Sequence, residues 1–273
     1  MTNEEVITLS KNLGAELIGF APVERWDEYD EVALPYRPKA VWQPAETVIV
    51  LGIPLILPMV ETTPSIVYSE LYNTTNILLD QMAYRLSIGL MKEGYRALFL
   101  PRDGYGDIEI LVEKPVSSFG HVKAAEYGGL GTIGYNNCLL NPIYGPRVRY
   151  VSIFTDAKFE GSPMITENLC IDCGICKKLC PSKAFQDSHN SPVAQMDKVA
   201  CAKHHAALRD ESRYPCGICV KVCPIGKDRQ LFQSHHSQFY INEKEAISCE
   251  SKDPLYQSWR HIRDHGSSGN RKY

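Results

Sequence analysis

The stretch that decides the fold reads CIDCGICKKLCP, from Cys170 to Pro181. Its spacing is C-x2-C-x2-C-x3-C-P, the run with which bacterial ferredoxins bind [4Fe–4S] clusters. Three closely spaced thiolates can wrap three corners of such a cluster, and the proline ends the turn that follows. This run therefore predicts an iron–sulfur centre.

A second and shorter run, CGICVKVCP, extends from Cys216 to Pro224. It repeats the C-x2-C-x3-C-P part but lacks a cysteine three residues before Cys216. Cys201 is the only cysteine between the two runs, and it brings the number of thiols to eight. Eight thiolates predict two clusters, because each [4Fe–4S] cluster takes four.

The ligands are expected to cross between the runs, since the fourth cysteine of each run binds the other cluster in two-cluster ferredoxins. The first cluster is predicted to bind Cys170, Cys173, Cys176 and Cys223. The second cluster is predicted to bind Cys180, Cys201, Cys216 and Cys219.

Two alternatives to iron stay open for these cysteines: structural zinc, which also uses C-x2-C pairs, and unligated thiols in the core. Iron–sulfur is favoured because further cysteines follow at ferredoxin intervals and each run closes with proline. Gly174 and Gly217 would let the backbone approach sulfide closely. Cys138 and Cys249 fit neither set, and no role is predicted for them.

The whole chain has the composition of an ordinary folded protein. It has 273 residues, 44% of them hydrophobic, and its net charge is -3, so neither disorder nor attraction to a polyanion is indicated. The N-terminus is acidic and lacks the pattern of a secretory signal, which favours a cytoplasmic location where cysteines stay reduced. The longest apolar stretch, 48–60, contains Pro54 and Pro58, so no membrane span is predicted.

The first 165 residues contain one cysteine and alternate between helical and strand patterns. Helices are expected at the N-terminus, 69–94 and 121–127, and strands at 15–20, 47–53, 95–100 and 147–155. The predicted fold class is α/β, or α+β, for a cofactor and substrate domain at 1–165. A bacterial two-[4Fe–4S] ferredoxin-like domain is expected at 166–230, and a tail that packs on the core or is partly loose at 231–273.

A glycine-rich block, GGLGTIG, occupies residues 128–134. It formally contains G-x-G-x-x-G, but no Rossmann unit with an acidic residue about 20 positions on accompanies it, so dinucleotide binding is not predicted. Glycines so spaced allow the backbone to approach a planar or phosphate-bearing ligand. The candidate cofactor-binding residues are Gly129, Gly131, Gly134, Asn136, Lys123 and Arg147. His121 is a weak candidate for a catalytic proton donor, and the alternative is a surface helix with ordinary polar residues.

Three features together resemble the epoxyqueuosine reductase family and its iron–sulfur relatives, the reductive dehalogenases among them. They are the GLGxxGxN block from Gly129 to Asn136, the NPxYGPRVR block from Asn141 to Arg149, and the double cysteine motif. The resemblance covers most of residues 40–226. It implies a cytosolic enzyme whose nitroreductase-like domain holds a cobalamin that two [4Fe–4S] clusters reduce.

Two departures separate the chain from the tRNA-modifying members of that family. Those members carry a catalytic Asp in a D-x-x-P-x-x-E-R type stretch before the glycine block, where this chain has PVSSFGH at 115–121. They also continue past the clusters with helical repeats that grip tRNA, whereas about 47 residues follow Gly226 here. A shorter branch is indicated, and a tRNA substrate is not expected.

Three functions stay open on these grounds. The first is a cytoplasmic oxidoreductase in which two clusters, fed by a donor such as a ferredoxin or flavodoxin, pass electrons to a cofactor in residues 1–165 and so to a small substrate. The second is a non-catalytic electron-transfer or reductive-activation protein for a partner such as a corrinoid protein. The third is epoxyqueuosine reduction on tRNA.

Overall fold

The computed structural model describes residues 1–188, 191–232, 237–249 and 251–268. Its centre is a four-stranded sheet with the order β1-β2-β6-β3, and all three pairings are antiparallel. The strands are β1 (Leu17–Pro22), β2 (Thr47–Pro54), β6 (Val148–Thr155) and β3 (Ala97–Leu100). Each lies where the sequence predicts a strand. The mixed helix-and-sheet fold class is therefore confirmed, in its α+β form.

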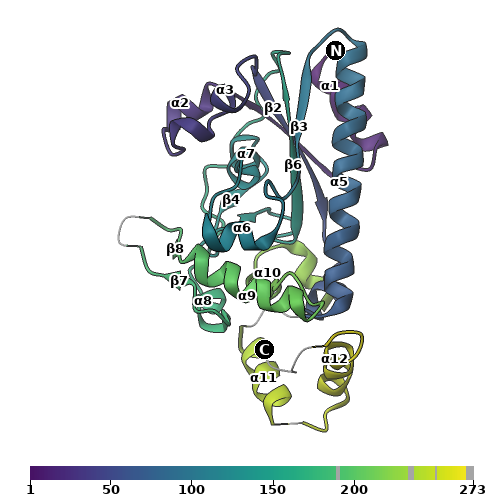
Figure 1. The fold of residues 1–273 in the computed structure, drawn as a ribbon, viewed down its shortest axis with the longest axis vertical. Coiled ribbons are helices and arrows are strands. Elements are labelled where there is room, and N and C mark those ends of the chain that lie inside the picture. Colours follow the sequence, from purple (N-terminus) through teal and green to yellow (C-terminus); the bar gives the residue numbers. More distant parts are fainter. Residues whose placement is uncertain (189–190, 233–236, 250, 269–273) are drawn as a thin grey trace.

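Helices cover both faces of this sheet (Figure 1). On one face lie α1 (Asn3–Asn12) and the long helix α5 (Ile66–Lys92), and on the other lies α7 (His121–Tyr127). The smaller helices of this half are α2 (Arg25–Tyr29), η1 (Leu34–Tyr36), α3 (Pro38–Val41), α4 (Leu57–Glu61) and α6 (Ile108–Glu113).

The sequence of strand β2 is apolar from Val48 to Pro54 because both faces of the strand are buried. Ile49 and Leu51 pack into the core beneath α1 and α5, whereas Val48 and Val50 pack into the core beneath α7. Successive side chains of a strand point to opposite faces, so a strand covered on both faces needs apolar residues at every position.

Local capping fixes where the first and longest helices begin. Thr2 and Glu5 form a capping box, in which each side chain accepts a hydrogen bond from the backbone N–H of the other. Helix α5 begins at Ile66, three residues before the predicted start at 69, because the Ser65 hydroxyl accepts from the N–H of Tyr68 and caps it.

The cysteine runs lie in short elements at one end of the sheet, below α6 in Figure 1. These are α8 (Ile175–Leu179), β7 (Phe185–Gln186), β8 (Gln195–Met196), α9 (Lys198–Asp210), α10 (Ile218–Lys221) and η2 (Lys227–Phe232). Gly174 precedes α8 and Gly217 precedes α10, each with φ of 66°. Only glycine adopts this left-handed conformation without strain, so both runs turn into their helices in the same way.

The last helices, α11 (Ser237–Ser248) and α12 (Pro254–Asp264), lie beyond the cysteine runs. Their described parts pack on the rest of the chain, because the Tyr240 hydroxyl donates to Glu61 and Arg263 donates to the carbonyl oxygens of Glu61 and Thr62. Residues 269–273 of the predicted tail lie outside the described residues. Among the helices that the structure describes, none is long and apolar enough to cross a membrane. The domain boundaries at 165 and 230 stay predictions.

Candidate functional site

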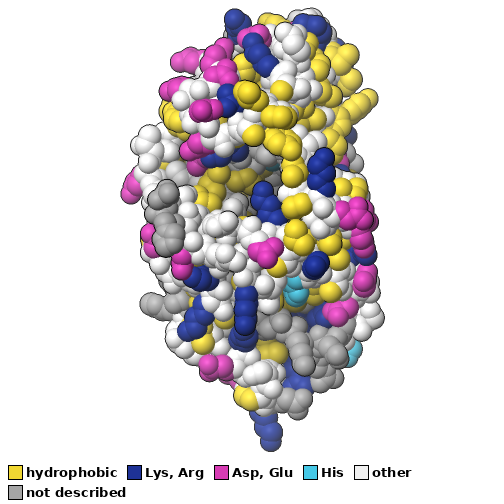
Figure 2. Space-filling model, turned by 60° about the vertical axis from the view of Figure 1, so that its left-hand side comes forward, with side chains coloured by type: hydrophobic (Ala, Val, Ile, Leu, Met, Phe, Trp, Pro, Cys, Tyr) yellow, Lys and Arg dark blue, Asp and Glu magenta, His cyan; other side chains and the backbone are white. Residues whose placement is uncertain are grey.

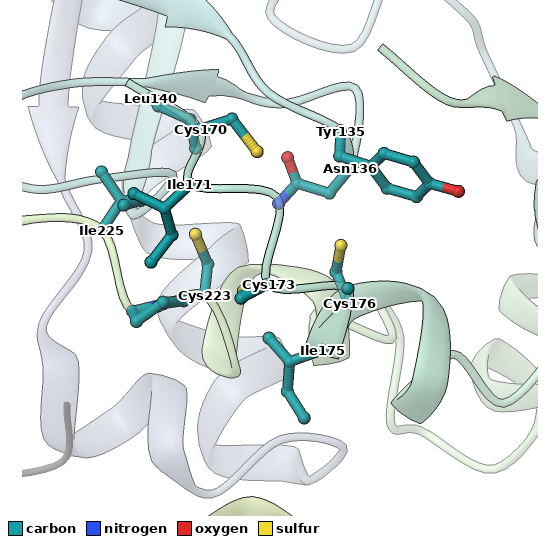
Figure 3. A pocket seen from close by; sticks show the side chains of 12 residues that line it. Tyr135, Asn136, Leu140, Cys170, Ile171, Cys173, Ile175, Cys176, Cys223 and Ile225 are labelled. Carbon is teal, nitrogen blue, oxygen red and sulfur yellow. The ribbon is translucent and has the colours of Figure 1, made fainter. Parts of the chain in front are cut away.

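The four cysteines predicted for the first cluster lie around one pocket. Its lining includes Cys170, Cys173, Cys176 and Cys223, and Figure 3 shows the sulfur atoms of Cys170, Cys176 and Cys223 pointing into the same space. Apolar side chains close the remaining sides: Leu140, Ile171, Ile175 and Ile225. Cys173 is exposed whereas Cys176 and Cys223 are buried, so this pocket faces solvent on the side of the first run.

The four cysteines predicted for the second cluster also lie together. Burial raises the pKa of the Cys201 thiol to about 12, and the neighbouring thiols of Cys219 and Cys180 raise it further. Burial likewise raises the pKa of Cys216, to which Cys219, Cys201 and Cys180 again contribute. The Cys176 thiol, whose pKa burial raises to about 12, is influenced by Cys219 as well as by Cys223. The thiols of the two predicted sets therefore lie near one another. Among the described residues no three of them are arranged to hold a metal ion, and the division into two sets of four stays a prediction.

One further thiol reaches the second set without being predicted to do so. Cys138 lies close to Cys219, and its proximity, together with burial, raises the pKa of the Cys219 thiol. It is carried there by the hairpin of β4 (Thr132–Ile133) and β5 (Leu139–Leu140). Sequence spacing could not reveal this contact, because Cys138 has no cysteine near it along the chain.

Asn136 and Arg147 are the predicted binding residues that contact the cysteine runs. The Asn136 amide donates to the carbonyl oxygen of Cys219 at 3.1 Å, and its Oδ1 accepts from the N–H of Cys138 at 3.2 Å. Arg147 is fully buried and donates to the carbonyl oxygen of Cys223 at 3.1 Å. Both residues therefore hold the second run in place through its backbone.

The three glycines of the block lie against the protein's own atoms. A Cβ atom added to Gly129 would collide with the carbonyl oxygen of Pro163, and one added to Gly131 with that of Leu140. At Gly134 it would lie 2.6 Å from Cδ1 of Leu140. Real Cβ atoms do not approach other atoms within 3.0 Å, so chain packing alone requires glycine at 129 and 131, where the neighbour is backbone. At 134 the Leu140 side chain would have to shift.

Replacing Gly131 by alanine is expected to lower the free energy of unfolding by about 1–3 kcal/mol, because the added methyl group overlaps backbone that cannot move freely. Gly106→Ala is the matched control, since its Cβ would lie 3.6 Å from Ile110 in ordinary contact. Thermal unfolding of the two variants measures the difference. Equal stability of both variants would contradict the packing role.

Lys123 and His121, on α7, make their polar contacts away from the cysteines. Lys123 is paired with Glu31 and Glu126, at 2.7 and 2.6 Å. The His121 ring lies 2.9 Å from the Ser152 hydroxyl through Nδ1 and 2.9 Å from the Pro101 carbonyl oxygen through Nε2. Burial lowers the pKa of His121 to about 4, which keeps the ring neutral at physiological pH. Its role as a proton donor stays a prediction.

A partly buried polar cluster around Arg149 is not predicted by the sequence reasoning. The Arg149 guanidinium donates to Asp103 at 2.8 Å and to Asn76 at 3.0 Å, and it lies over the Tyr72 ring at 4.4 Å from the centroid. The Tyr72 hydroxyl donates to Asp103 at 2.5 Å. The NPxYGPRVR block ends at Arg149, but with 15 tyrosines in the chain no pattern singles out the one that meets it.

Aromatic side chains enclose this cluster and connect it to the second cysteine run. The hydroxyls of Tyr105 and Tyr214 lie 2.8 Å apart, and the Tyr214 ring packs edge-on against Tyr72 with centroids 5.5 Å apart. On the other side, a Cβ atom on Gly217 would overlap the Tyr68 ring. Burial raises the pKa of Tyr68, and the thiols of Cys216 and Cys219 are close enough to contribute. Tyr68 therefore stands between the Arg149 cluster and the second set of thiols.

Comparison with known proteins finds similarity to a 4Fe-4S binding domain and to two groups of reductases. The 4Fe-4S binding domain family matches residues 163–186. Tetrachloroethene reductive dehalogenase of Dehalobacter restrictus is 24% identical over 195 residues, which cover 70% of this chain and 31% of that protein. Epoxyqueuosine reductase of Pseudomonas aeruginosa is 24% identical over 207 residues, which cover 66% of this chain and 53% of that protein.

A solved reductive dehalogenase, described with a mechanism for B12-dependent dehalogenation, has the same fold with a TM-score of 0.63 at 22% identity. The match covers 84% of this chain and 33% of that one. The chain thus spans about a third to a half of the length of the curated relatives it matches. Two cysteine sets, a matching 4Fe-4S domain and these relatives agree with the predicted resemblance. The chain is thus similar to the epoxyqueuosine reductases and the reductive dehalogenases, and it carries a 4Fe-4S binding motif at residues 163–186.

Proposed function

We propose that the chain is an iron–sulfur reductase in which two [4Fe–4S] clusters pass electrons to a small substrate bound at the Arg149 cluster. The observation that carries this proposal is the contact between Gly217, inside the second cysteine run, and Tyr68, which borders that cluster. The Arg149 cluster is a partly buried polar site beside a set of four thiols. An electron that leaves a cluster bound by these thiols could therefore reduce a substrate held there.

The two predicted sets of thiols fit such clusters in number and in surroundings. Backbone N–H groups also face the sulfurs, as where Ala184 donates to Sγ of Cys180 at 3.4 Å. Hydrogen bonds of this kind are one of the means by which proteins set the potential of iron–sulfur clusters. When bound, the clusters supply one-electron transfer at low potential.

The side chains around Arg149 supply charge and protons rather than electrons. Arg149 fixes a positive charge that can orient a polar or anionic substrate, and Asp103 balances it when the site is empty. The Tyr72 hydroxyl holds a proton between Asp103 and Arg149, within reach of a group bound there. Tyr105 and Tyr214 cover one side of the cluster and exclude water there. Exclusion of water limits side reactions of a reduced substrate.

A corrinoid, which the resemblance implies, does not fit the glycine block. Protein atoms occupy the space over Gly129, Gly131 and Gly134, and Lys123 and Arg147 are already paired with carboxylates. We therefore derive no step through cobalamin. The experiment below nevertheless includes it, because a solved relative is described as B12-dependent.

The donor would meet the chain at the first cysteine run. Lys177, Lys178 and Lys183 are exposed beside it, and Ile171 is 65% exposed within it. Figure 2 shows Lys and Arg side chains over the lower half of one face, the level at which Figure 1 places the cysteine runs. Such a surface suits an acidic donor of the ferredoxin or flavodoxin kind, and the electron transfer rate should then fall as salt is raised.

Anaerobic reconstitution with iron and sulfide tests this function. About eight irons per chain and EPR signals of two reduced clusters are expected. A solved relative was crystallised with 3-bromo-4-hydroxybenzoic acid, so this acid serves as the first small probe, with and without added cobalamin. Reoxidation of the clusters with release of bromide, slowed in Tyr72→Phe, would support a reductase.

Other outcomes of this experiment separate the remaining functions. Two clusters that reduce no small probe but do reduce an added corrinoid protein would favour the electron-transfer alternative. Reaction with an epoxyqueuosine-containing tRNA stem loop, the ligand of another solved relative, would favour tRNA modification. A chain that retains zinc and no iron would rule out all three.

A further inference from the structure

Two guanidinium groups converge on the backbone carbonyl of Cys223. Nη1 of Arg147 and Nε of Arg229 each donate to this oxygen at 3.1 Å. Both side chains are 0% exposed. Removing a charged group from water is costly, so two such groups beside one ligand of the first cluster are a specific feature of this site.

Each guanidinium is held in a fixed position by partners of its own. Arg147 pairs with Asp228 through two hydrogen bonds of 2.6 Å, and a Cβ atom on Gly226 would lie 2.5 Å from its Nη2. Arg229 pairs with Glu61. In each ion pair it is the guanidinium, not the carboxylate, that contacts the Cys223 carbonyl oxygen. The positive charge of each pair is therefore the one nearer to Cys223.

The other two cysteines of the same run receive uncharged donors. The Thr63 hydroxyl donates to the carbonyl oxygen of Cys216, and the Asn136 amide donates to that of Cys219 at 3.1 Å. These two cysteines belong to the second predicted set, whereas Cys223 belongs to the first. The two clusters would therefore differ in the charge placed next to their ligands.

The electrostatic effect of this difference has a definite sign. Reduction adds one negative charge to a cluster, and a nearby fixed positive charge favours the reduced form. Both guanidinium groups lie against the backbone of Cys223, so their charges act on the cluster that this residue is predicted to bind.

We propose that Arg147 and Arg229 raise the reduction potential of the cluster bound through Cys223 above that of the cluster bound through Cys216 and Cys219. This inference rests on the proposed function, because it assumes both clusters. The ferredoxin-type or flavodoxin-type donor loses one electron and the cluster of the first set gains it. That electron is retained there until it passes to the second set, which lies beside Tyr68 and the substrate site.

Redox titration of the reconstituted full chain, followed by EPR, tests the proposal. Arg147→Gln and Arg229→Gln are each expected to shift one of the two clusters to a lower potential and to leave the other unchanged. Arg147→Lys should restore most of the shift, because it keeps the charge. Arg209→Gln is the matched control, since Arg209 pairs with Glu109 at the surface and should change neither potential.

A second pair of variants distinguishes an electrostatic effect from a loss of folding, because the expected shift has the opposite sign. Asp228→Asn and Glu61→Gln remove the balancing carboxylate and keep the arginine, so they should move the same cluster to a higher potential. Equal shifts of both clusters, or no shift in any variant with a full iron content, would overturn the inference. An iron content well below eight in the unmodified chain would instead overturn the proposed function.

Discussion

Replacing Cys201 by serine is expected to lower the iron content of the reconstituted chain from about eight atoms to about four. Cys201 is predicted to supply the ligand that the second run lacks, and its thiol lies near those of Cys180, Cys216 and Cys219. A cluster with three thiolates loses iron readily, whereas the first set keeps all four of its cysteines. The EPR signal of one cluster should disappear and that of the other should persist.

The structure provides a competing ligand, and this makes the comparison informative. Cys138 lies close enough to Cys219 to raise the pKa of its thiol, so it could complete the second set in place of Cys201. If it did, Cys138→Ser would lose half of the iron and Cys201→Ser would keep it. Cys249→Ser is the control, because Cys249 is exposed and its thiol donates to the carbonyl oxygen of Ala246. Loss of all the iron in Cys201→Ser would show that the two clusters form only together.

The elements predicted from the sequence share a local cause. Thr2 and Glu5 cap their helix with contacts three residues apart, and 47–53 forms a buried strand because no residue after Thr47 in it is polar. The two sets of thiols could be grouped for a similar reason. Ferredoxin spacing confines three ligands to one turn of chain and leaves few ways to complete each set.

The contacts that the sequence could not supply join distant parts of the chain. Arg149 meets Tyr72 across 77 positions, and Arg147 meets Asp228 across 81. Charged and aromatic residues have no period that reveals such pairs, and the antiparallel sheet order β1-β2-β6-β3 decides which of them meet. The glycines of the block show the opposite case, in which a pattern in the sequence suggests a contact and the structure places protein atoms there instead. Their spacing suggests a ligand, but the neighbours of their Cα atoms are Pro163 and Leu140.

Replacing Glu243 by alanine is expected to lower the free energy of unfolding by about 3–5 kcal/mol, the usual cost of removing one partner from a buried ion pair. Glu243, on α11, is 1% exposed. Its carboxylate accepts two hydrogen bonds of 2.8 Å from Nζ of Lys221 and one of 3.2 Å from Arg263. Without it, two cations would stay buried near each other with no carboxylate between them.

The variant should also release iron, because Lys221 lies in the turn between Cys219 and Cys223. Thermal unfolding followed by circular dichroism measures the stability, and the visible absorbance of the clusters measures the release. Glu245→Ala is the matched control, since Glu245 lies on the same helix and is exposed.

The circular dichroism and the cluster absorbance together show whether α11 and α12 stabilise the part of the chain that holds the clusters. If they fall together and at a lower temperature than in Glu245→Ala, α11 is part of the unit that holds the clusters. If Glu243→Ala behaves as Glu245→Ala does, the buried pair is not needed for that unit. In that case α11 and α12 only cover it, as expected of the tail at 231–273 that the sequence predicts to pack on the core or to be partly loose.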